Sequence, residues 1–183
     1  MERLTFVTGN PNKAKYLSHV FDIPVEHTKL DLAEIQSLDL KEIVIDKAAR
    51  AYAILKTPLL VEDISLTFVA LNKLPGPLIK WFLESLGNEG LCRLLDGKND
   101  RTALAEVEFA YCDEAGVQTF GGFSRGSIAP ETRGQNGYGW DPIFIPEGSD
   151  TTWGEMEDAD RFSDTHLRRI ALEKLKEFLK QKP

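Results

Sequence analysis

Hydrophobic and polar positions follow two different periods along the chain. Residues 3–9 ("RLTFVTG") and 102–112 ("TALAEVEFAYC") have strand-like patterns, whereas residues 39–55 and about 166–181 carry apolar side chains at helical spacing. Asp39 is the expected N-cap of the first of these helices. The turn "DEAG" and the segment "VQTFGGFSRGSIA" predict a hairpin that returns after the long strand. The pattern predicts an α/β fold with a mixed sheet.

The remaining segments are shorter. Leu59–Val61 predicts a brief buried strand, and "NKLPGP" (72–77) predicts a turn that precedes helical sequence at 78–97. Residues 133–150 are rich in glycine and aromatic residues, which indicates a loop with a short strand at 143–145. A length of 183 residues suits one domain over 1–183, with room for two lobes.

Composition narrows the possible functions. The chain has 22 Lys+Arg against 29 Asp+Glu and a net charge of -7, so it lacks the basic footprint of a nucleic-acid-binding protein. No apolar stretch reaches the roughly 20 residues of a membrane span, and the sequence starts directly on a strand pattern without a signal peptide. Cys92 and Cys112 have no metal-like spacing. We therefore expect a cytoplasmic protein that does not bind membranes and keeps its thiols reduced.

The first candidate site is "TGNPNKAK", residues 8–15. A strand leads through Gly9 into a helix for which Asn10 is a good N-cap, and the free amides of a helix start can bind an anion. Lys13 lies in the first turn, where the helix dipole disfavours a cation unless a phosphate sits beside it. The segment is not a Walker A loop. An ordinary strand–turn–helix with an exposed lysine is the alternative.

The second candidate site is acidic. Glu62 and Asp63 follow the predicted strand at Leu59–Val61, and Glu34 lies in "DLAEIQS". Carboxylates of this kind suit Mg²⁺, which uses one or two of them together with substrate phosphates and waters. A carboxylate could also act as a general base toward water. The alternative is a solvated pair of charges at a strand end.

The third candidate site is "GYGWDP", residues 137–142, in which Tyr138 and Trp140 alternate with glycines. A nucleotide base could stack on Trp140, while a turn with core-packing aromatics is the alternative. A helix start for phosphates, an acidic metal site and an aromatic platform together describe a nucleotide site. Lys47 and Lys80 could add positive charge for a triphosphate, although each could also be a solvated surface residue.

Several segments carry a resemblance to a known family. "TGNPNKAK", "DLAEIQS", "LVEDISL", "ALNKLPGPLIKWFLE", "GWDPIFIPEGSDTTWGEM" and "THLRRIAL" resemble, in order and in spacing, the inosine triphosphate pyrophosphatases, which remove non-standard purine nucleotides. The resemblance implies a mixed, twisted sheet with flanking helices and two lobes with a central cleft. It also implies a homodimer that uses Mg²⁺ to convert ITP, dITP or XTP to the monophosphate and pyrophosphate.

The resemblance also implies roles for individual residues. Asp63 matches the proton acceptor of the family, and Glu34 and Asp63 match its metal ligands. The positions that match phosphate contacts are Thr8, Gly9, Asn10, Lys13, Lys47 and Lys80. The positions that match the base and ribose side are Tyr138, Gly139, Trp140, Asp141 and His166. With such a set, Mg²⁺ can activate water for attack on the α-phosphorus while lysines stabilise the departing pyrophosphate.

The sequence departs from the family at positions around the substrate. Ile64 stands where a Ser or Thr is usual, Leu78 replaces a Tyr, and Arg161 and Phe162 replace Lys-Asn. Leu167 replaces the arginine of a Ser-His-Arg motif, and a leucine donates no hydrogen bond. Either Arg168 or Arg169 substitutes for that arginine, or Leu167 simply joins the apolar face of the last helix. Two alternatives to an ITP enzyme therefore stay open: hydrolysis of a different modified nucleotide, and weakly catalytic nucleotide binding.

Overall fold

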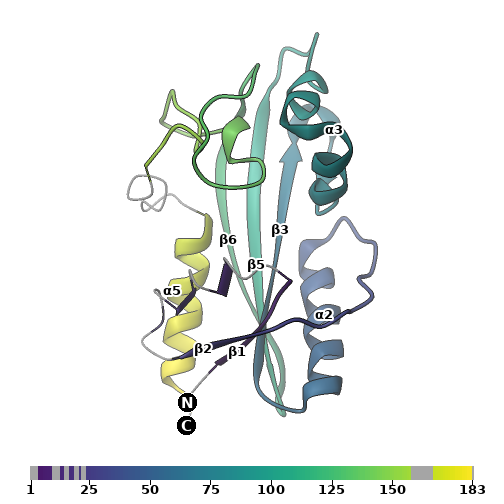
Figure 1. Ribbon diagram of the computed structural model, residues 1–183, viewed down its shortest axis with the longest axis vertical. Coiled ribbons are helices and arrows are strands. Elements are labelled where there is room, and N and C mark those ends of the chain that lie inside the picture. The colour runs from purple at the N-terminus through teal and green to yellow at the C-terminus, as the bar shows by residue number, and fades with distance from the viewer. Residues whose placement is uncertain are drawn as a thin grey trace. The chain divides into compact units, whose positions relative to one another are not determined.

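The computed structural model describes residues 4–9, 13–14, 17–18, 21, 24–157 and 167–182. Its elements, in chain order, are β1 Leu4–Val7, β2 Val25–Thr28, α2 Leu40–Leu55, β3 Leu59–Phe68, η1 Val69–Leu71, β4 Pro75–Gly76, α3 Ile79–Arg93, β5 Thr102–Asp113, β6 Gly116–Ile128, η2 Asp141–Ile143, β7 Phe144–Pro146 and α5 Leu167–Lys180. Figure 1 shows these elements and confirms the predicted α/β class.

The described strands form one mixed sheet with the order β2-β1-β3-β5-β6-β7, and β4 pairs with β3. β1 is parallel to both β2 and β3, with Leu4 opposite Val25 and Thr5 opposite Leu59. β3–β4 and β6–β7 are antiparallel. The strand β2 was not predicted, because "VEHT" is short and polar and its two central residues are exposed.

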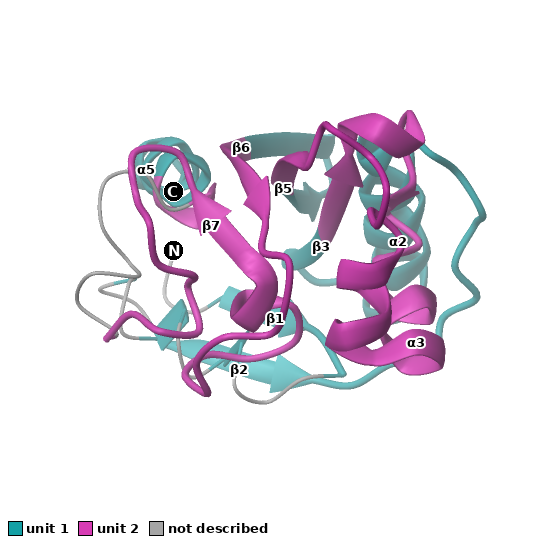
Figure 2. Ribbon diagram, turned by 90° about the horizontal axis from the view of Figure 1, so that it is seen from above, with its two compact units in different colours: residues 1–63, 107–121, 170–183 teal, residues 64–106, 122–169 magenta. Residues whose placement is uncertain are grey.

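The chain divides into two compact units, which Figure 2 colours separately. Unit 1 comprises residues 1–63, 107–121 and 170–183, and unit 2 comprises residues 64–106 and 122–169. The strands β3, β5 and β6 each contribute residues to both units.

In unit 1, two helices cover opposite faces of the sheet, as Figure 1 shows. The core on the α2 face contains Val44, Ala48 and Ala51 of α2, packed against alternating strand residues such as Val61 of β3 and Ala110 of β5. On the other face, the ring of Tyr111 meets Phe178 of α5 at 5.4 Å. Neighbouring strand residues point to opposite faces, so odd-numbered residues of this part of β3 face α2.

Two residues shape the helices locally: Asp39 at the start of α2 and Gly87 within α3. Asp39 caps α2 by accepting a hydrogen bond from the amide of Lys41 at 2.9 Å, as predicted. In unit 2, Gly87 interrupts α3 with a φ of 65°, a left-handed conformation that favours glycine. Among the described residues, no helix has the length and apolar character needed to span a bilayer.

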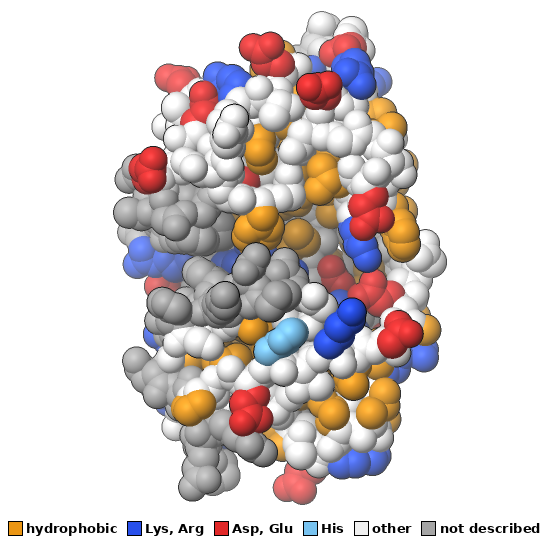
Figure 3. Space-filling view, in the orientation of Figure 1, with side chains coloured by type: hydrophobic (Ala, Val, Ile, Leu, Met, Phe, Trp, Pro, Cys, Tyr) orange, Lys and Arg blue, Asp and Glu red, His pale blue; other side chains and the backbone are white. Residues whose placement is uncertain are grey.

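The two cysteines are buried, and charged side chains of both signs lie on one face of the molecule. On the face shown in Figure 3, the acidic and basic side chains of the described residues are interspersed. Cys92 and Cys112 are buried and free, and burial raises the pKa of each thiol. Neither thiol is set up for reactivity.

Candidate active site

The acidic cluster of unit 1 is built around one lysine. Lys47 on α2 places its Nζ 2.7 Å from Glu34 Oε1 and 3.2 Å from Asp63 Oδ2. Asp63 shares the α2-facing side of β3 with Val61, so strand alternation delivers its carboxylate to the helix that carries Lys47. The fold thus brings together Glu34, Lys47 and Asp63, which are separated by 13 and 16 positions along the chain.

Electrostatics around Lys47 favour the charged ammonium. Burial on its own would lower the pKa of Lys47, but the charges of Asp63 and Glu34 outweigh it, and their hydrogen bonds add to this. The pKa of Lys47 is therefore raised above its ordinary value. Two carboxylates that converge on one ammonium form a place where positive charge is strongly favoured.

Glu62, the other acid of the predicted pair, lies in a different environment. Its side chain is 1% exposed, against 24% for Asp63, and its Oε1 lies 3.1 Å from the Nζ of Lys13. Lys13 and Ala14 are helical, as are Leu17 and Ser18. The strand was expected to end at Val61 but continues to Phe68, with Glu62 paired to Lys13 within it.

The turn after β1 brings Thr8 and Gly9 to the end of that strand. The amide of Thr8 donates to the carbonyl of Thr28 at 3.0 Å, and the carbonyl of Thr8 lies 2.6 Å from Nε2 of His27. Gly9 is exposed, and a side chain there would meet nothing within 4 Å. Asn10 lies outside the described residues.

The loop at 137–141 belongs to unit 2 and separates its two aromatic rings. Trp140 is 5% exposed and packs against Phe144 and Trp153, with both ring centroids at 5.6 Å. The expectation that a base stacks on Trp140 is therefore not supported, and the core-packing alternative describes this residue. Tyr138 is 44% exposed and is the accessible ring of the motif.

Hydrogen bonds hold this loop in shape. Asp141 is buried, and its Oδ2 accepts from the amide of Tyr138 at 3.0 Å. Gly139 has a φ of 67°, which favours glycine, and its carbonyl accepts from Asn88 Nδ2 at 2.9 Å. Asn88 was missed in the sequence, where the only local signal is its position directly after the helix-breaking Gly87.

The last helix resolves part of the question about the missing arginine. Leu167 is 1% exposed and belongs to the buried apolar face of α5. Arg168 is buried as well, and its guanidinium lies 5.7 Å from the centre of the Tyr138 ring, whereas Arg169 is exposed. Arg161 and His166 lie outside the described residues.

Two further predicted residues lie in unit 2. Lys80 is exposed in the first turn of α3, and its Nζ lies 5.1 Å from the centre of the Trp81 ring. Ile64 is half-buried on β3. The predicted residues therefore divide by unit: Thr8, Gly9, Lys13, Glu34, Lys47 and Asp63 lie in unit 1, and Ile64, Lys80, Tyr138, Gly139, Trp140, Asp141 and Leu167 lie in unit 2.

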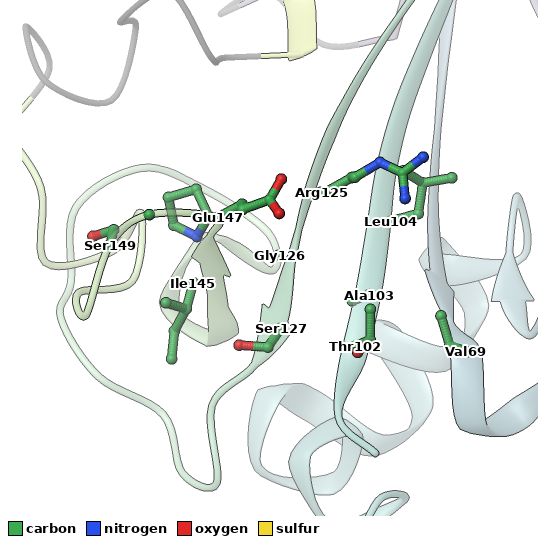
Figure 4. A pocket seen from close by; sticks show the side chains of 12 residues that line it. Val69, Thr102, Ala103, Leu104, Arg125, Gly126, Ser127, Ile145, Glu147 and Ser149 are labelled. Atoms are coloured by element: carbon green, nitrogen blue, oxygen red, sulfur yellow. The ribbon is translucent and has the colours of Figure 1, made fainter.

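A groove of about 480 Å³ in unit 2 contains none of these residues. Its lining, drawn in Figure 4, comes from η1, β5, β6, β7 and the turn that follows β7, and includes Arg125, Ser127 and Glu147. Arg125 also lies over the ring of Phe123 at 5.9 Å. None of the motifs in the sequence predicts this surface.

Comparison with known proteins shows to which family the chain belongs. An inosine triphosphate pyrophosphatase of Scheffersomyces stipitis is 42% identical over 98% of this chain and 98% of that protein. One from Batrachochytrium dendrobatidis is 45% identical over 100% and 96%. The solved structure of a HAM1 protein from Coxiella burnetii superposes with a TM-score of 0.86 at 25% identity, covering 98% of this chain and 99% of that one. The sequence profile of the Ham1 family matches residues 4–178, and with relatives this similar over nearly the whole chain, the protein belongs to the Ham1 family.

Proposed function

We propose that this protein hydrolyses non-standard nucleoside triphosphates of the ITP, dITP and XTP type to the monophosphate and pyrophosphate, which clears them from the nucleotide pool. The observation that carries the proposal is the convergence of Glu34 and Asp63 on the ammonium of Lys47. A triphosphate with its metal ion needs such a mixture of acids and lysines. The relatives named inosine triphosphate pyrophosphatase support the choice of substrate.

The metal we propose is Mg²⁺, held by Glu34 and Asp63. The fit rests on their geometry, because two carboxylates that already lie within 3.2 Å of a single cation can share another one. Mg²⁺ commonly takes one or two carboxylates and completes its shell with phosphate oxygens and water. When bound, the ion neutralises phosphate charge and lowers the pKa of water.

The chain's own residues would then carry the remaining steps. Asp63, which keeps partial exposure, accepts a proton from the attacking water, whose oxygen forms a bond to the α-phosphorus. The bond from that phosphorus to the α–β bridging oxygen breaks, and pyrophosphate leaves with the electron pair. Lys13, Lys47 and Lys80 stabilise the leaving group as point charges.

Base recognition is the part in which this chain departs from its family. Tyr138 offers an exposed ring on which a base can stack, since aromatic stacking tolerates any base. Leu167 is buried and donates no hydrogen bond. This favours a second candidate, the same reaction on a different modified nucleotide, because the arginine beside the Tyr138 ring is Arg168, at 5.7 Å, and a donor at a shifted position discriminates differently.

A substrate panel tests both candidates. Pyrophosphate release is measured with Mg²⁺ for ITP, dITP, XTP, dUTP, modified nucleotides and the four standard triphosphates. The first candidate predicts the highest kcat/KM for ITP, dITP and XTP, and the second predicts it for another modified nucleotide. Binding of the nucleotides without any pyrophosphate release would overturn both and favour a regulatory nucleotide-binding protein.

We also propose that the protein is a cytoplasmic homodimer that does not bind nucleic acid. The net charge of -7 supports the last point. Analytical ultracentrifugation tests the dimer, and a single monomeric species at micromolar concentration would contradict it.

A further inference from the structure

The two adjacent acids of β3 serve different lysines. Val61 faces the α2 core, so Asp63, two residues on, points to the same face and meets Lys47. Glu62 lies one residue out of phase with both and meets Lys13 instead. The register of the strand therefore separates two carboxylates that the sequence presents as a pair.

Glu62 and Asp63 also differ in whether they lie beside Glu34, the other acid that we propose as a metal ligand. Within the part of the chain that the structure describes, no three Asp, Glu, His or Cys side chains are grouped so that they could hold one ion. Glu62 is paired with Lys13 on the other side of β3, whereas Glu34 and Asp63 both contact Lys47. Its side chain is also almost fully buried, whereas that of Asp63 keeps partial exposure.

A buried carboxylate next to a lysine restrains that lysine. Charge inside a protein is tolerated when it is paired, and removal of one partner leaves the other uncompensated. The lysine ammonium is a compact charge on a flexible stem, so a fixed acceptor on the rigid strand β3 limits where it can go. Lys13 keeps 17% of its side chain exposed, so a ligand can reach it while Glu62 holds it.

We propose that Glu62 is a positioning residue that holds the ammonium of Lys13 for the phosphates of the substrate, and that it is not a metal ligand. The inference rests on the proposed function, since it assigns a part of the same site. Lys13 donates hydrogen bonds to the phosphate oxygens while Glu62 accepts one from behind, so its ammonium is preplaced before substrate arrives. Asp63 alone of the two acids then serves the metal and the proton.

The first experiment separates the acids without turnover. Binding of inorganic triphosphate is measured by calorimetry in EDTA for the wild type, Glu62→Gln, Asp63→Asn and Lys13→Met. We expect Glu62→Gln to weaken binding about tenfold and Lys13→Met at least as much, because a charge-assisted contact is misplaced or lost. Asp63→Asn should bind no more weakly than the wild type, because it removes a negative charge that repels phosphate. Unchanged binding by Glu62→Gln would overturn the proposal.

The second experiment uses turnover and a double-mutant cycle. Glu62→Gln should raise KM for the best triphosphate about tenfold while the Mg²⁺ concentration at half-maximal rate stays within about twofold. In the Lys13→Met background, Glu62→Gln should add nothing further, since the two residues act as one unit. A shift in Mg²⁺ dependence like that of Asp63→Asn, or effects that multiply in the double variant, would overturn the proposal.

Controls keep the two hypotheses apart. Asp46→Asn removes a carboxylate from a different ion pair on α2, in which Arg50 Nε lies 2.6 Å from Asp46 Oδ2, and should change none of these quantities. Glu62→Asp keeps the charge and should restore part of the triphosphate affinity that Glu62→Gln loses. A wild type that releases no pyrophosphate from any nucleotide would overturn the proposed function. An active wild type whose Glu62 variants behave as metal-site variants would overturn the positioning role alone.

Discussion

The two lysines of unit 1 that we propose to contact phosphate, and the loop at 137–141 of unit 2, are held in place by different forces. In unit 1, Lys13 and Lys47 are fixed by carboxylates, with nitrogen–oxygen distances from 2.7 to 3.2 Å. In unit 2, Tyr138 is fixed through its neighbours: the ring of Trp140 packs in the core, and backbone groups of the loop bond to Asn88 and Asp141.

This difference teaches which kind of substitution each region can tolerate. Charges that compensate one another inside unit 1 make each partner dependent on the other, so the loss of one leaves an unbalanced group. The loop depends on shape and burial, so its exposed ring can change while its buried ring cannot. Substitutions of the paired charges in unit 1 should change the rate of the reaction and the binding of phosphate. In the loop, substitution of the exposed Tyr138 should change substrate binding, whereas substitution of the buried Trp140 should change the free energy of unfolding.

The largest effect should follow from Asp63→Asn. We expect kcat for the best triphosphate to fall by about 10²- to 10⁴-fold, because the amide cannot take a proton from water and is a poorer metal ligand. Pyrophosphate release at saturating substrate and Mg²⁺ measures it. Asp46→Asn on α2 is the matched control and should retain the wild-type rate. An Asp63→Asn enzyme with full activity would remove this residue from the chemistry.

The next effect should be on folding, in unit 2. Trp140→Ala should lower the free energy of unfolding by about 3–5 kcal/mol, because it leaves a cavity beside Phe144 and Trp153. Urea denaturation measures it. Trp81→Ala removes a ring that is 56% exposed and should change stability by less than about 1 kcal/mol. Equal losses for both tryptophans would show that Trp140 does not anchor the loop through the core.

Much of the fold, and less of the site, can be predicted from the sequence. The cap at Asp39 and the hairpin after residue 112 are local signals, and both were correct. The strand β2 carries no such signal, because "VEHT" owes its place to pairing with β1 rather than to its own pattern. Local patterns report local structure, while edge strands are decided by their partners.

Local sequence patterns also predict the candidate site only in part. The sequence pointed to Glu62 and Asp63 together, but whether they share a face depends on whether the strand continues through them, and the charges concealed that continuation. Trp140 and Tyr138 are two residues apart and look alike in sequence, yet one ring is buried and the other is exposed. Asn88 reaches Gly139 across 51 positions, and no local pattern predicts such a contact.

A smaller effect should separate Tyr138 from Trp140. Tyr138→Ala should raise KM for the best triphosphate by about 5- to 150-fold, because the loss of one stacked base costs roughly 1–3 kcal/mol. The free energy of unfolding should stay near that of the wild type, since the ring is exposed. Tyr138→Phe keeps the ring and should keep most of the affinity. A Tyr138→Ala variant with unchanged KM would move the base site away from this loop.

The smallest effect should come from an ion pair that lies outside both sets of residues. Lys182 Nζ contacts Asp113 Oδ2 at 2.6 Å in unit 1, and the amide of Ala115 donates to Oδ1 at 2.9 Å. Burial acts to raise the pKa of Asp113, but these bonds outweigh it, so the pKa of Asp113 lies below its ordinary value. A depressed folded-state pKa means that the ionised carboxylate stabilises the fold at neutral pH, and that this contribution is lost as pH falls below about 4.

Asp113→Asn should therefore destabilise the fold by about 1 kcal/mol at pH 7, a value that allows for solvent screening of the pair. The difference from the wild type should shrink as the pH falls from about 4 toward 2, where the wild-type carboxylate also loses its charge. Urea denaturation across this range measures it, with Glu114→Gln on the same hairpin as the control. Turnover should stay unchanged, because this pair, unlike those of Lys13 and Lys47, holds no residue assigned to the substrate. A loss of kcat without a loss of stability would mean that ion pairs in unit 1 affect catalysis beyond the residues named here.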